Sequence, residues 1–385
     1  MARGLHASQG NSAKSLPPVP KSVSNETFPS LTGLRFVLAL WIAVYHLVRF
    51  YGPPGLAEVW WIKLGDARVD AFFALSGFVL AHVYAMDAGA FRAKAFFRAR
   101  VARLYPLHLL GLGVLLVAVL GAAALGRGGE AGGYTPLGLA ANLFMLQAWG
   151  VPGAAQWNFP VWTLSAEAFS YALFPLVIAF APLLRKRPLL VWGAGLAAVM
   201  AVGAIWPLLG AGPLAEATQT FGAVRGALEF FVGVAARFAF TRARFSASTM
   251  LALAVFGALV AGIGAVGNLD LWVVAAGASL LVFAVAGIDR AGAKSPLAHP
   301  AMQELGRWSY ALFALHIPLF VIMTHLLRVA GVDGPVSAPA GAGMVAVAIA
   351  AAGMAHHFVE EPARRFIRDV RLPRLGVQNP LKLAN

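Results

Sequence analysis

The sequence predicts an all-α polytopic membrane protein of about ten transmembrane helices, with both termini in the cytoplasm. Three observations indicate this fold class: the composition, the number of long apolar runs, and the placement of the positive charges. Of the 385 residues, 59% are hydrophobic and 12% are charged, and the mean hydropathy is +0.74. About a quarter of the residues in a soluble domain carry charge, so this composition excludes an ordinary soluble domain.

Ten apolar runs are long enough to cross a bilayer, which takes about 20 residues as a helix. The predicted spans lie near 31–50, 68–86, 104–125, 160–181, 188–208, 222–240, 248–266, 270–288, 305–328 and 338–359. A further run, 136–149, is too short for a span and is interpreted as re-entrant or interfacial. Residues 31–366 therefore form the predicted transmembrane domain, between a disordered cytoplasmic tail at 1–30 and a basic cytoplasmic tail at 367–385.

The positive charges indicate the orientation. With both termini inside, 21 of the 30 Lys and Arg residues fall in cytoplasmic segments and four in outer loops, in accord with the positive-inside rule. The predicted localisation is therefore multi-pass, in the inner (cytoplasmic) cell membrane. The net charge of +14 lies at the ends of apolar runs and not on a soluble basic face, so the lipid bilayer is an expected partner and nucleic acid is not. The absence of cysteine excludes disulfides and thiolate metal sites, and no metal site is predicted.

The first span, LTGLRFVLALWIAVYHLVRF, carries two ionisable residues, Arg35 and His46. They are eleven residues apart, about 16 Å and three turns along a helix, so they share a face. An arginine at the centre of a span costs about 2.5 to 3.5 kcal/mol on insertion scales. Either Arg35 extends to the head groups and His46 is a packed side chain, or the pair marks a site inside the membrane. In the second case a long ligand lies along the helix, and His46 is the general base.

Two short motifs accompany the next two spans. In DAFFALSGF, Ser76 and Gly77 allow the close approach of a neighbouring helix. In FFRARVARLYP, Arg100 and Arg103 lie one turn apart at the predicted cytoplasmic mouth of the span at 104–125. Guanidinium groups suit phosphate recognition, although two arginines at such a place are more often an ordinary membrane anchor.

Glu167, in WTLSAEAFSY, lies about seven residues inside the span at 160–181, counted from its outer end. Its depth is comparable to that of His46, and a carboxylate there needs a partner because an unpaired buried charge is costly. We predict that Glu167 orients or charges His46, as an acid orients a catalytic histidine. The alternative is a structural ion pair with an arginine.

The last two predicted spans contain weaker signals. Tyr310 and His316, in GRWSYALFALH, are six residues apart and do not share a helix face. His316 and Ser76 are expected to support the site indirectly, and Tyr310 is a candidate donor to an oxyanion. At EEPARR, residues 360–365, Pro362 is predicted to stop the final helix.

Taken together, these motifs resemble the acyltransferase-3 family of integral membrane O-acyltransferases. The matches occur in order from about residue 31 to 366, as GLRFVLALWIAVYH, FFALSGF, FFRARVARLYP, WTLSAEAFSYALFP, SYALFALH and EEPARR. The resemblance implies about ten transmembrane helices and the transfer of an acyl group, often acetyl, from cytoplasmic acyl-CoA. The implied acceptor is a hydroxyl of a carbohydrate or small glycosylated molecule. Acyl-CoA is then the donor substrate, and no permanently bound cofactor is implied.

The resemblance also implies roles for individual residues. Arg35 and His46 match the family's Arg–His pair in the first span. Arg100 and Arg103 match its RxxR motif, and Glu167 matches its glutamate. The implied roles are acyl-CoA binding for the three arginines and catalysis for the histidine and the glutamate.

Two departures and a rival function stand beside this interpretation. Ala168 stands where the family has a second acid, and His108 where an aromatic residue is more usual. The rival is a transporter or flippase with His46 and Glu167 as a proton relay. Transporters more often show internal repeats, and none is visible in this sequence. The acceptor, the acyl chain length and the oligomeric state do not follow from the sequence.

Overall fold

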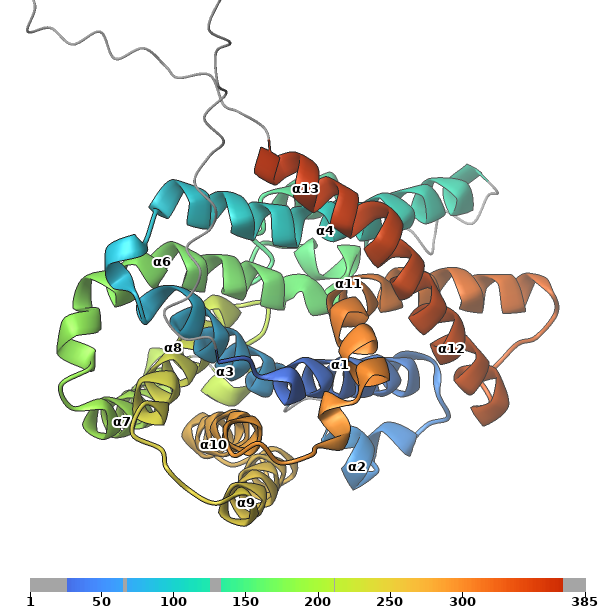
Figure 1. The fold of residues 1–385 in the computed structure, drawn as a ribbon. Coiled ribbons are helices and arrows are strands. Elements are labelled where there is room, and N and C mark those ends of the chain that lie inside the picture. The colour runs from blue at the N-terminus through green and yellow to red at the C-terminus, as the bar shows by residue number, and fades with distance from the viewer. Residues whose placement is uncertain (1–25, 65–67, 125–132, 211, 370–385) are drawn as a thin grey trace, which may run out of the picture.

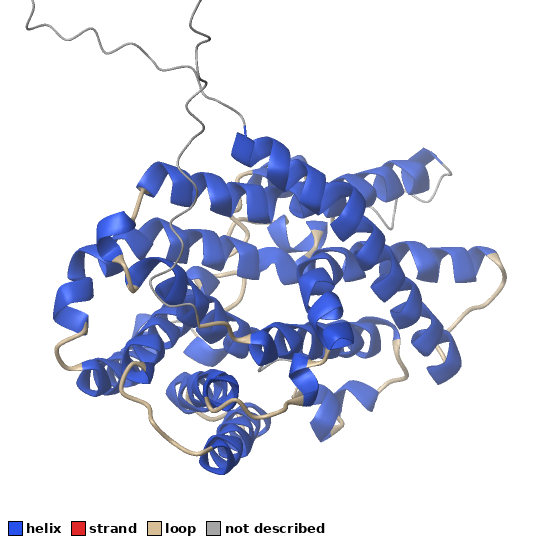
Figure 2. Cartoon of the chain, in the orientation of Figure 1, coloured by secondary structure: helices blue, strands red, loops and turns tan. Residues whose placement is uncertain are grey.

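The structure, a computed structural model, describes residues 26–64, 68–124, 133–210 and 212–369. Over these residues every regular element is a helix and no strand is present (Figure 2). The predicted all-α class is therefore confirmed. Most of the two predicted tails lies outside the described residues, while the described residues 29–30 and 367–369 belong to helices.

Thirteen α-helices follow one another along the described parts of the chain (Figure 1). They are α1 (Pro29–Tyr51), α2 (Trp60–Lys63), α3 (Arg68–Leu80), α4 (Ala93–Ala124), α5 (Pro136–Leu143), α6 (Trp162–Leu184), α7 (Pro188–Ile205), α8 (Gly222–Phe240), α9 (Ala247–Val266), α10 (Leu271–Arg290), α11 (Pro300–Val329), α12 (Ala338–Ala355) and α13 (Glu361–Asp369). Two π-helical turns, Ala81–Ala85 and His356–Glu360, continue α3 and α12.

Nine helical segments in the described part of the chain are long and apolar enough to cross a membrane. They correspond to nine of the ten predicted spans, and the protein is a multi-pass membrane protein. The tenth predicted span is also a helix, α8. Because it carries Arg225, Glu229 and Arg237, it is not among the segments that are apolar enough to cross a membrane.

The surroundings of α8 explain how it tolerates its charges. It packs against α3, α6, α7 and α10, and nearly all of its residues are buried. Protein side chains, and not lipid, therefore surround the charged groups. The contact with α3 is especially close, because a Cβ atom at Gly77 would lie 1.9 Å from the carbonyl oxygen of Phe230. The prediction that the Ser76–Gly77 pair allows a close helix approach is confirmed for Gly77 at this contact.

The helix α1 packs along α11 and also against α3 and α10. Its buried residues recur at the helical spacing, and they include Ala39, Ile42, Ala43 and His46. His46 therefore lies in the apolar stripe of α1 that faces other helices, and the contact with α11 decides its surroundings.

The helix α4 begins eleven residues before the predicted span at 104–125. The motif FFRARVARLYP is consequently helical throughout, with Pro106 inside the helix. Arg100 and Arg103 lie on consecutive turns of one continuous helix, which fixes the direction in which both side chains point.

The run at 136–149 forms the eight-residue helix α5 followed by turns, so the prediction that it is too short for a span is confirmed. The prediction that Pro362 stops the final helix is wrong. Pro362 is the second residue of α13, which continues from α12 through the π-helical turn His356–Glu360. In that turn the N–H of Glu361 bonds to the carbonyl of His356. The missing N–H of the proline thus falls where the hydrogen-bond register changes, and the helix continues.

Outside the spans, Glu26 ties the start of α1 to the end of α10. Its carboxylate accepts hydrogen bonds from Arg290 at 2.5 and 2.8 Å. The Arg290 guanidinium lowers the pKa of Glu26, chiefly through these hydrogen bonds. The segment before α1 is thereby held against the end of α10.

Candidate functional site

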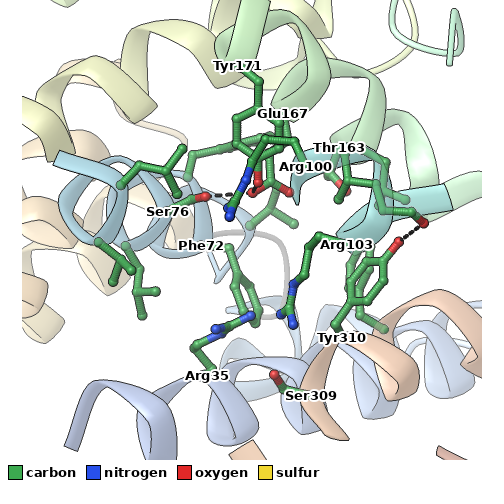
Figure 3. Close-up of a pocket in the computed structure, with 18 residues that line it drawn as sticks. Arg35, Phe72, Ser76, Arg100, Arg103, Thr163, Glu167, Tyr171, Ser309 and Tyr310 are labelled. Atoms are coloured by element: carbon green, nitrogen blue, oxygen red, sulfur yellow. Dashed lines mark hydrogen bonds between the residues drawn. The ribbon is translucent and has the colours of Figure 1, made fainter. Parts of the chain in front are cut away.

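Residues from α1, α3, α4, α6 and α11 enclose a cavity of about 130 Å³ (Figure 3). Its walls are largely apolar, with side chains such as Phe72, Phe73 and Phe313. The polar side chains that line it are Arg35, Ser76, Arg100, Arg103, Thr163, Glu167, Tyr171, Ser309 and Tyr310. The structure therefore brings together six of the eight site residues named from the sequence.

The three arginines enter the cavity from two helices, with Arg35 on α1 opposite Arg100 and Arg103 on α4 (Figure 3). Arg35 makes no hydrogen bond or ion pair to any described residue, and its Nε is buried without a partner. The guanidinium of Arg100 lies between aromatic rings, with its carbon 5.7 Å from the ring centre of Tyr84. The Nε of Arg100 is likewise buried without a partner.

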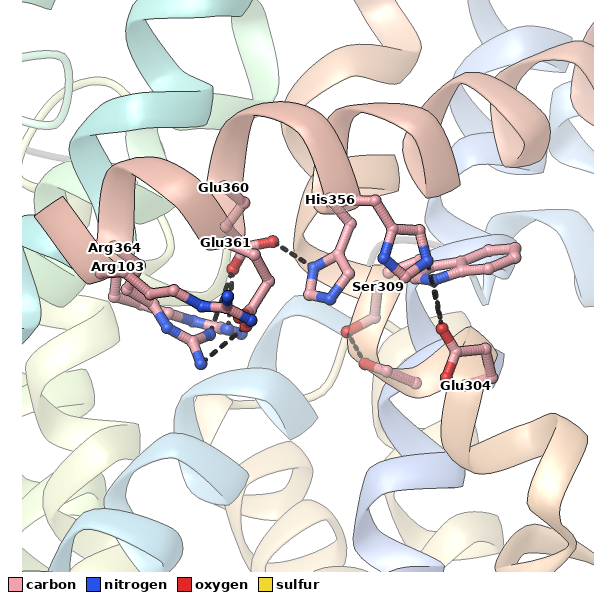
Figure 4. A network of polar contacts seen from close by, with 11 residues as sticks. Arg103, Glu304, Ser309, His356, Glu360, Glu361 and Arg364 are labelled. Carbon is pink, nitrogen blue, oxygen red and sulfur yellow. Dashed lines mark hydrogen bonds and ion pairs between the residues drawn. The ribbon is translucent and has the colours of Figure 1, made fainter.

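Arg103 differs from the other two arginines because it has an anionic partner outside the cavity. Its Nη1 lies 3.1 Å from Oε1 of Glu360, at the junction of α12 and α13 (Figure 4). Glu360 is fully buried, and its other oxygen lies 2.8 Å from Nδ1 of His356. Arg364 lies 3.9 Å from the same carboxylate. The EEPARR motif therefore neutralises one of the cavity's arginines.

Glu167 is the one carboxylate among the described residues that line the cavity. It accepts hydrogen bonds from the hydroxyl of Ser76, at 2.6 Å, and from the hydroxyl of Tyr171. The predicted contact between Glu167 and His46 is not formed, and no ion pair with an arginine replaces it among the described residues. Within the described residues, the cavity thus holds three guanidinium groups against a single lining carboxylate, and its charge favours an anion.

His46 does not line the cavity. Its Nδ1 lies 2.9 Å from Nε2 of His316 on α11, and the planes of the two rings are nearly parallel, at 12°, with the ring centres 5.1 Å apart. Both rings are buried, with 6% of His46 and none of His316 exposed. Phe50 and Phe159 pack against the His46 ring. The structure therefore separates the predicted residues into an arginine cavity and a histidine pair, about three helical turns apart along α1.

Tyr310 lines the cavity but has its hydroxyl occupied. The hydroxyl donates to the carbonyl of Leu104 at 2.5 Å, so it is not a free donor for an oxyanion in this structure. Tyr310 and His316 face different surroundings, as their six-residue separation on α11 predicted.

Sequence reasoning missed Asn158, which directly precedes the Phe159 ring that contacts His46. Asn158 has a backbone φ of 149°, a value that residues other than glycine rarely adopt. Its amide nitrogen donates to the carbonyl of Ala314, and its Oδ1 is buried without a partner. A single asparagine in the turn before WTLSAEAFSY was the available signal, and nothing in its spacing marked it.

Sequence reasoning also missed an ionic cluster between α3 and α8. Arg225 Nη2 lies 2.5 Å from Oδ1 of Asp70, and its Nε lies 3.7 Å from Glu229. All three residues are buried. The sequence showed each charge inside a predicted span. It did not show that Asp70 and Arg225, which are 155 residues apart in the chain, are in contact.

Comparisons with known proteins bear on what this arrangement does. A family model described as an acyltransferase domain matches residues 28–355. The chain is 31% identical over 369 residues to a protein of Streptomyces mycarofaciens named acyltransferase MdmB, covering 88% of this chain and 92% of that protein. It is 41% identical over 92 residues to a protein of Rhizobium radiobacter named protein 2 in picA locus, covering 23% of this chain and 44% of that protein. No solved structure matches the chain.

Proposed function

The chain belongs to the acyltransferase-3 family of membrane acyltransferases, and from that premise we propose that it moves an acyl group from cytoplasmic acyl-CoA to an acceptor hydroxyl. The acyl group that we propose is acetyl. The acceptor class that we propose is a carbohydrate or glycosylated molecule. The proposed location is the inner cell membrane, with the end of the bundle that carries Arg100 and Arg103 facing the cytoplasm.

The unpartnered Arg35 carries this proposal. A guanidinium inside a membrane span is stable only with an anion, a polar cavity or a hydrogen-bond acceptor beside it. Among the described residues no such acceptor bonds to Arg35, and Arg100 and Arg103 line the same cavity. The phosphate groups of coenzyme A are multivalent anions, and arginine forks recognise phosphate oxygens in pairs. Phosphate binding would therefore balance the positive charge that Glu167 alone leaves in this cavity.

The position of His46 supports a donor that extends along α1. Arg35 and His46 lie on one helix about 16 Å apart. A donor held by its phosphates at Arg35 has to extend along the helix for its thioester to reach the imidazole. Glu167, held by Ser76 and Tyr171, then balances the charge of the arginines near the phosphates.

The reaction needs one base and no change of oxidation state. The imidazole of His46 takes the proton of the acceptor hydroxyl as that oxygen attacks the thioester carbonyl carbon. The tetrahedral intermediate collapses, the carbon–sulfur bond breaks, and the thiolate of coenzyme A takes the proton from the imidazole. The products are the acyl ester and free coenzyme A, and His46 returns to its starting state.

Donor binding tests the proposal directly. The purified full chain in lipid nanodiscs is titrated with acetyl-CoA and with S-acetylpantetheine, which has the same thioester but no phosphate. We expect acetyl-CoA to bind at least tenfold more tightly, since each charge-assisted hydrogen bond contributes about 1.5 to 3 kcal/mol. Arg35→Gln should reduce this preference by about tenfold or more, whereas the control Lys94→Gln, at an exposed position near the start of α4, should keep it. Equal binding of the two thioesters would refute the role of the arginines.

A further inference from the structure

We infer that His316 is a positioning residue that holds His46 in the tautomer with the proton on Nδ1, and so leaves Nε2 as the reacting base. The inference rests on the proposed function for its chemical meaning, but the tautomer itself follows from geometry. The inference assigns to His316 the role of orienting His46, which the sequence suggested for Glu167.

The contacts of His316 show which of its ring nitrogens carries the proton. Its Nδ1 lies 2.7 Å from the carbonyl oxygen of Phe313 and 3.2 Å from that of Leu312, both in the preceding turn of α11. A carbonyl oxygen can only accept a hydrogen bond. The Nδ1 of His316 therefore carries the proton. In a neutral imidazole the second nitrogen is then an acceptor, so Nε2 of His316 presents a lone pair.

The proton position in His316 determines the proton position in His46. Its Nδ1 lies 2.9 Å from Nε2 of His316, within hydrogen-bond distance. Because Nε2 of His316 is the acceptor, Nδ1 of His46 is the donor. The lone pair of His46 is consequently on Nε2. For two neutral rings in this geometry, no other arrangement of protons satisfies the contacts.

The nitrogen of His46 that has the lone pair, Nε2, lies beside aromatic rings. Nε2 of His46 makes no hydrogen bond to any described residue, yet it is not among the atoms that are buried without a partner. Some space therefore remains beside it. The ring packs against the aromatic rings of Tyr45, Phe50 and Phe159, and no carboxylate of the described residues bonds to either histidine. The acceptor hydroxyl would approach this side of the ring.

His46 and His316 can then accept and release the proton without a hydrogen bond from either ring to a carboxylate of the described residues. When Nε2 of His46 takes the proton of the acceptor hydroxyl, its Nδ1–H keeps donating to the neutral Nε2 of His316. The imidazolium is held in place by one hydrogen bond, and the backbone carbonyls of Phe313 and Leu312 orient His316 in turn. The proton leaves to the thiolate of coenzyme A, so both rings end as they began.

A spectroscopic measurement on the unmodified protein tests the tautomer. The full chain, labelled with ¹⁵N-histidine in nanodiscs, is compared with His46→Gln to identify the His46 signals. The ¹⁵N chemical shift separates a protonated ring nitrogen from one with a lone pair. We expect His46 at neutral pH to be neutral, with the proton on Nδ1. A proton on Nε2, or a cationic ring, would overturn the inference whatever the activity of the protein.

Two variants test whether His316 is the cause. His316→Phe keeps an aromatic ring but removes the acceptor, whereas His316→Gln keeps an acceptor oxygen within reach of His46. We expect His316→Phe to lower kcat by about 100-fold or more, on the scale of general base catalysis, with the donor KM unchanged. His316→Gln should recover most of that loss and keep the Nδ1–H signal of His46. His325→Phe, nine residues further along α11, is the control for losing a histidine of this helix.

The outcomes separate this inference from the proposed function. If His316→Phe retains the kcat of the unmodified chain, His316 does not position the base. If both variants lose activity equally while His46 keeps its Nδ1–H signal, His316 does not act through the tautomer, and the inference fails. If the tautomer is as expected but His46→Gln transfers acyl groups normally, the inference about the pair stands and the assignment of His46 as the base fails.

Discussion

Arg103 and Glu360 are joined by a contact of 3.1 Å that links the wall of the cavity to the junction of α12 and α13 (Figure 4). Glu360 is fully buried, so this contact is sheltered from solvent screening. An incoming phosphate must therefore compete with Glu360 for Arg103, while Arg35 has no such competitor among the described residues. The three arginines of the cavity are consequently not equivalent.

The first prediction ranks these arginines. Arg35→Gln and Arg100→Gln should each raise the dissociation constant for acetyl-CoA by about ten- to a hundredfold, as expected for the loss of a charge-assisted contact. Arg103→Gln should raise it less, because its charge is already partly balanced by Glu360. Calorimetric titration of the full chain with acetyl-CoA measures the three values.

Lys94→Gln is the control for the loss of one positive charge, since Lys94 is exposed near the start of the same helix. Binding that weakens equally in all four variants would indicate only the long-range effect of net charge. A larger loss in Arg103→Gln than in Arg35→Gln would contradict the ranking.

The sequence predicted the helices well because length and apolarity alone decide whether a segment can cross a bilayer. It predicted the neighbours of side chains poorly, and Glu167 shows why. The depth of a residue along a span is one coordinate, and it made Glu167 and His46 appear to be partners. The other coordinates are the rotation of each helix about its axis and the identity of its neighbours. Here α1 packs against α11, while α6 packs against α8. These follow only from the packing of all helices together.

The arginines could be found from sequence because a charge inside an apolar run stands out. His316 stood out as well, but a lone histidine in a span has no sign of its partner. The pairing with His46 requires α1 and α11 to pack in one register, and 270 residues separate the two rings. For the same reason, the contact of Asp70 with Arg225 could not be predicted from either residue alone.

The second prediction concerns this ionic cluster of Asp70, Arg225 and Glu229. Arg225→Gln leaves two buried carboxylates without their cation, and breaking a buried pair in this way costs about 3 to 5 kcal/mol. We expect the variant to unfold at a clearly lower temperature in detergent micelles. Arg307→Gln is the matched control, because Arg307 pairs with Glu304 but its side chain is 58% exposed. Its effect should stay below about 1 kcal/mol.

Adding Asp70→Asn to Arg225→Gln sharpens the test. If the instability comes from unpaired charge, removing the carboxylate as well should restore part of the loss, so the two effects should not add. Additive losses would mean that Arg225 stabilises the bundle by packing and not by its charge.

The third prediction concerns the orientation that places the arginine cavity within reach of cytoplasmic acyl-CoA. The chain has no cysteine, so single-cysteine variants can be labelled without background. Lys94→Cys and Arg365→Cys should react with a membrane-impermeant maleimide only in inverted vesicles. Leu137→Cys and Val332→Cys, both more than half exposed, should react in intact cells. The reverse pattern would place the arginines outside and remove the proposed route of the donor.

The fourth prediction separates two roles for Glu167. Glu167 is held by Ser76 and Tyr171 within the donor cavity, and its charge opposes that of the arginines. Glu167→Gln keeps an acceptor oxygen for Ser76 but removes the negative charge. If the carboxylate balances the arginines, acetyl-CoA should bind up to about tenfold more tightly, since a tenfold change corresponds to 1.4 kcal/mol, and kcat should change by less than tenfold. If instead Glu167 acts on His46, kcat should fall by about 100-fold or more, its pH optimum should move, and donor binding should stay the same.

Ser76→Ala removes the hydroxyl without changing the charge, so it should leave donor binding nearly unchanged under the first role. Measured together, the binding constant and the pH profile of kcat decide between the two roles. Charge balance predicts a change in the binding constant, and action on His46 predicts a change in the pH profile.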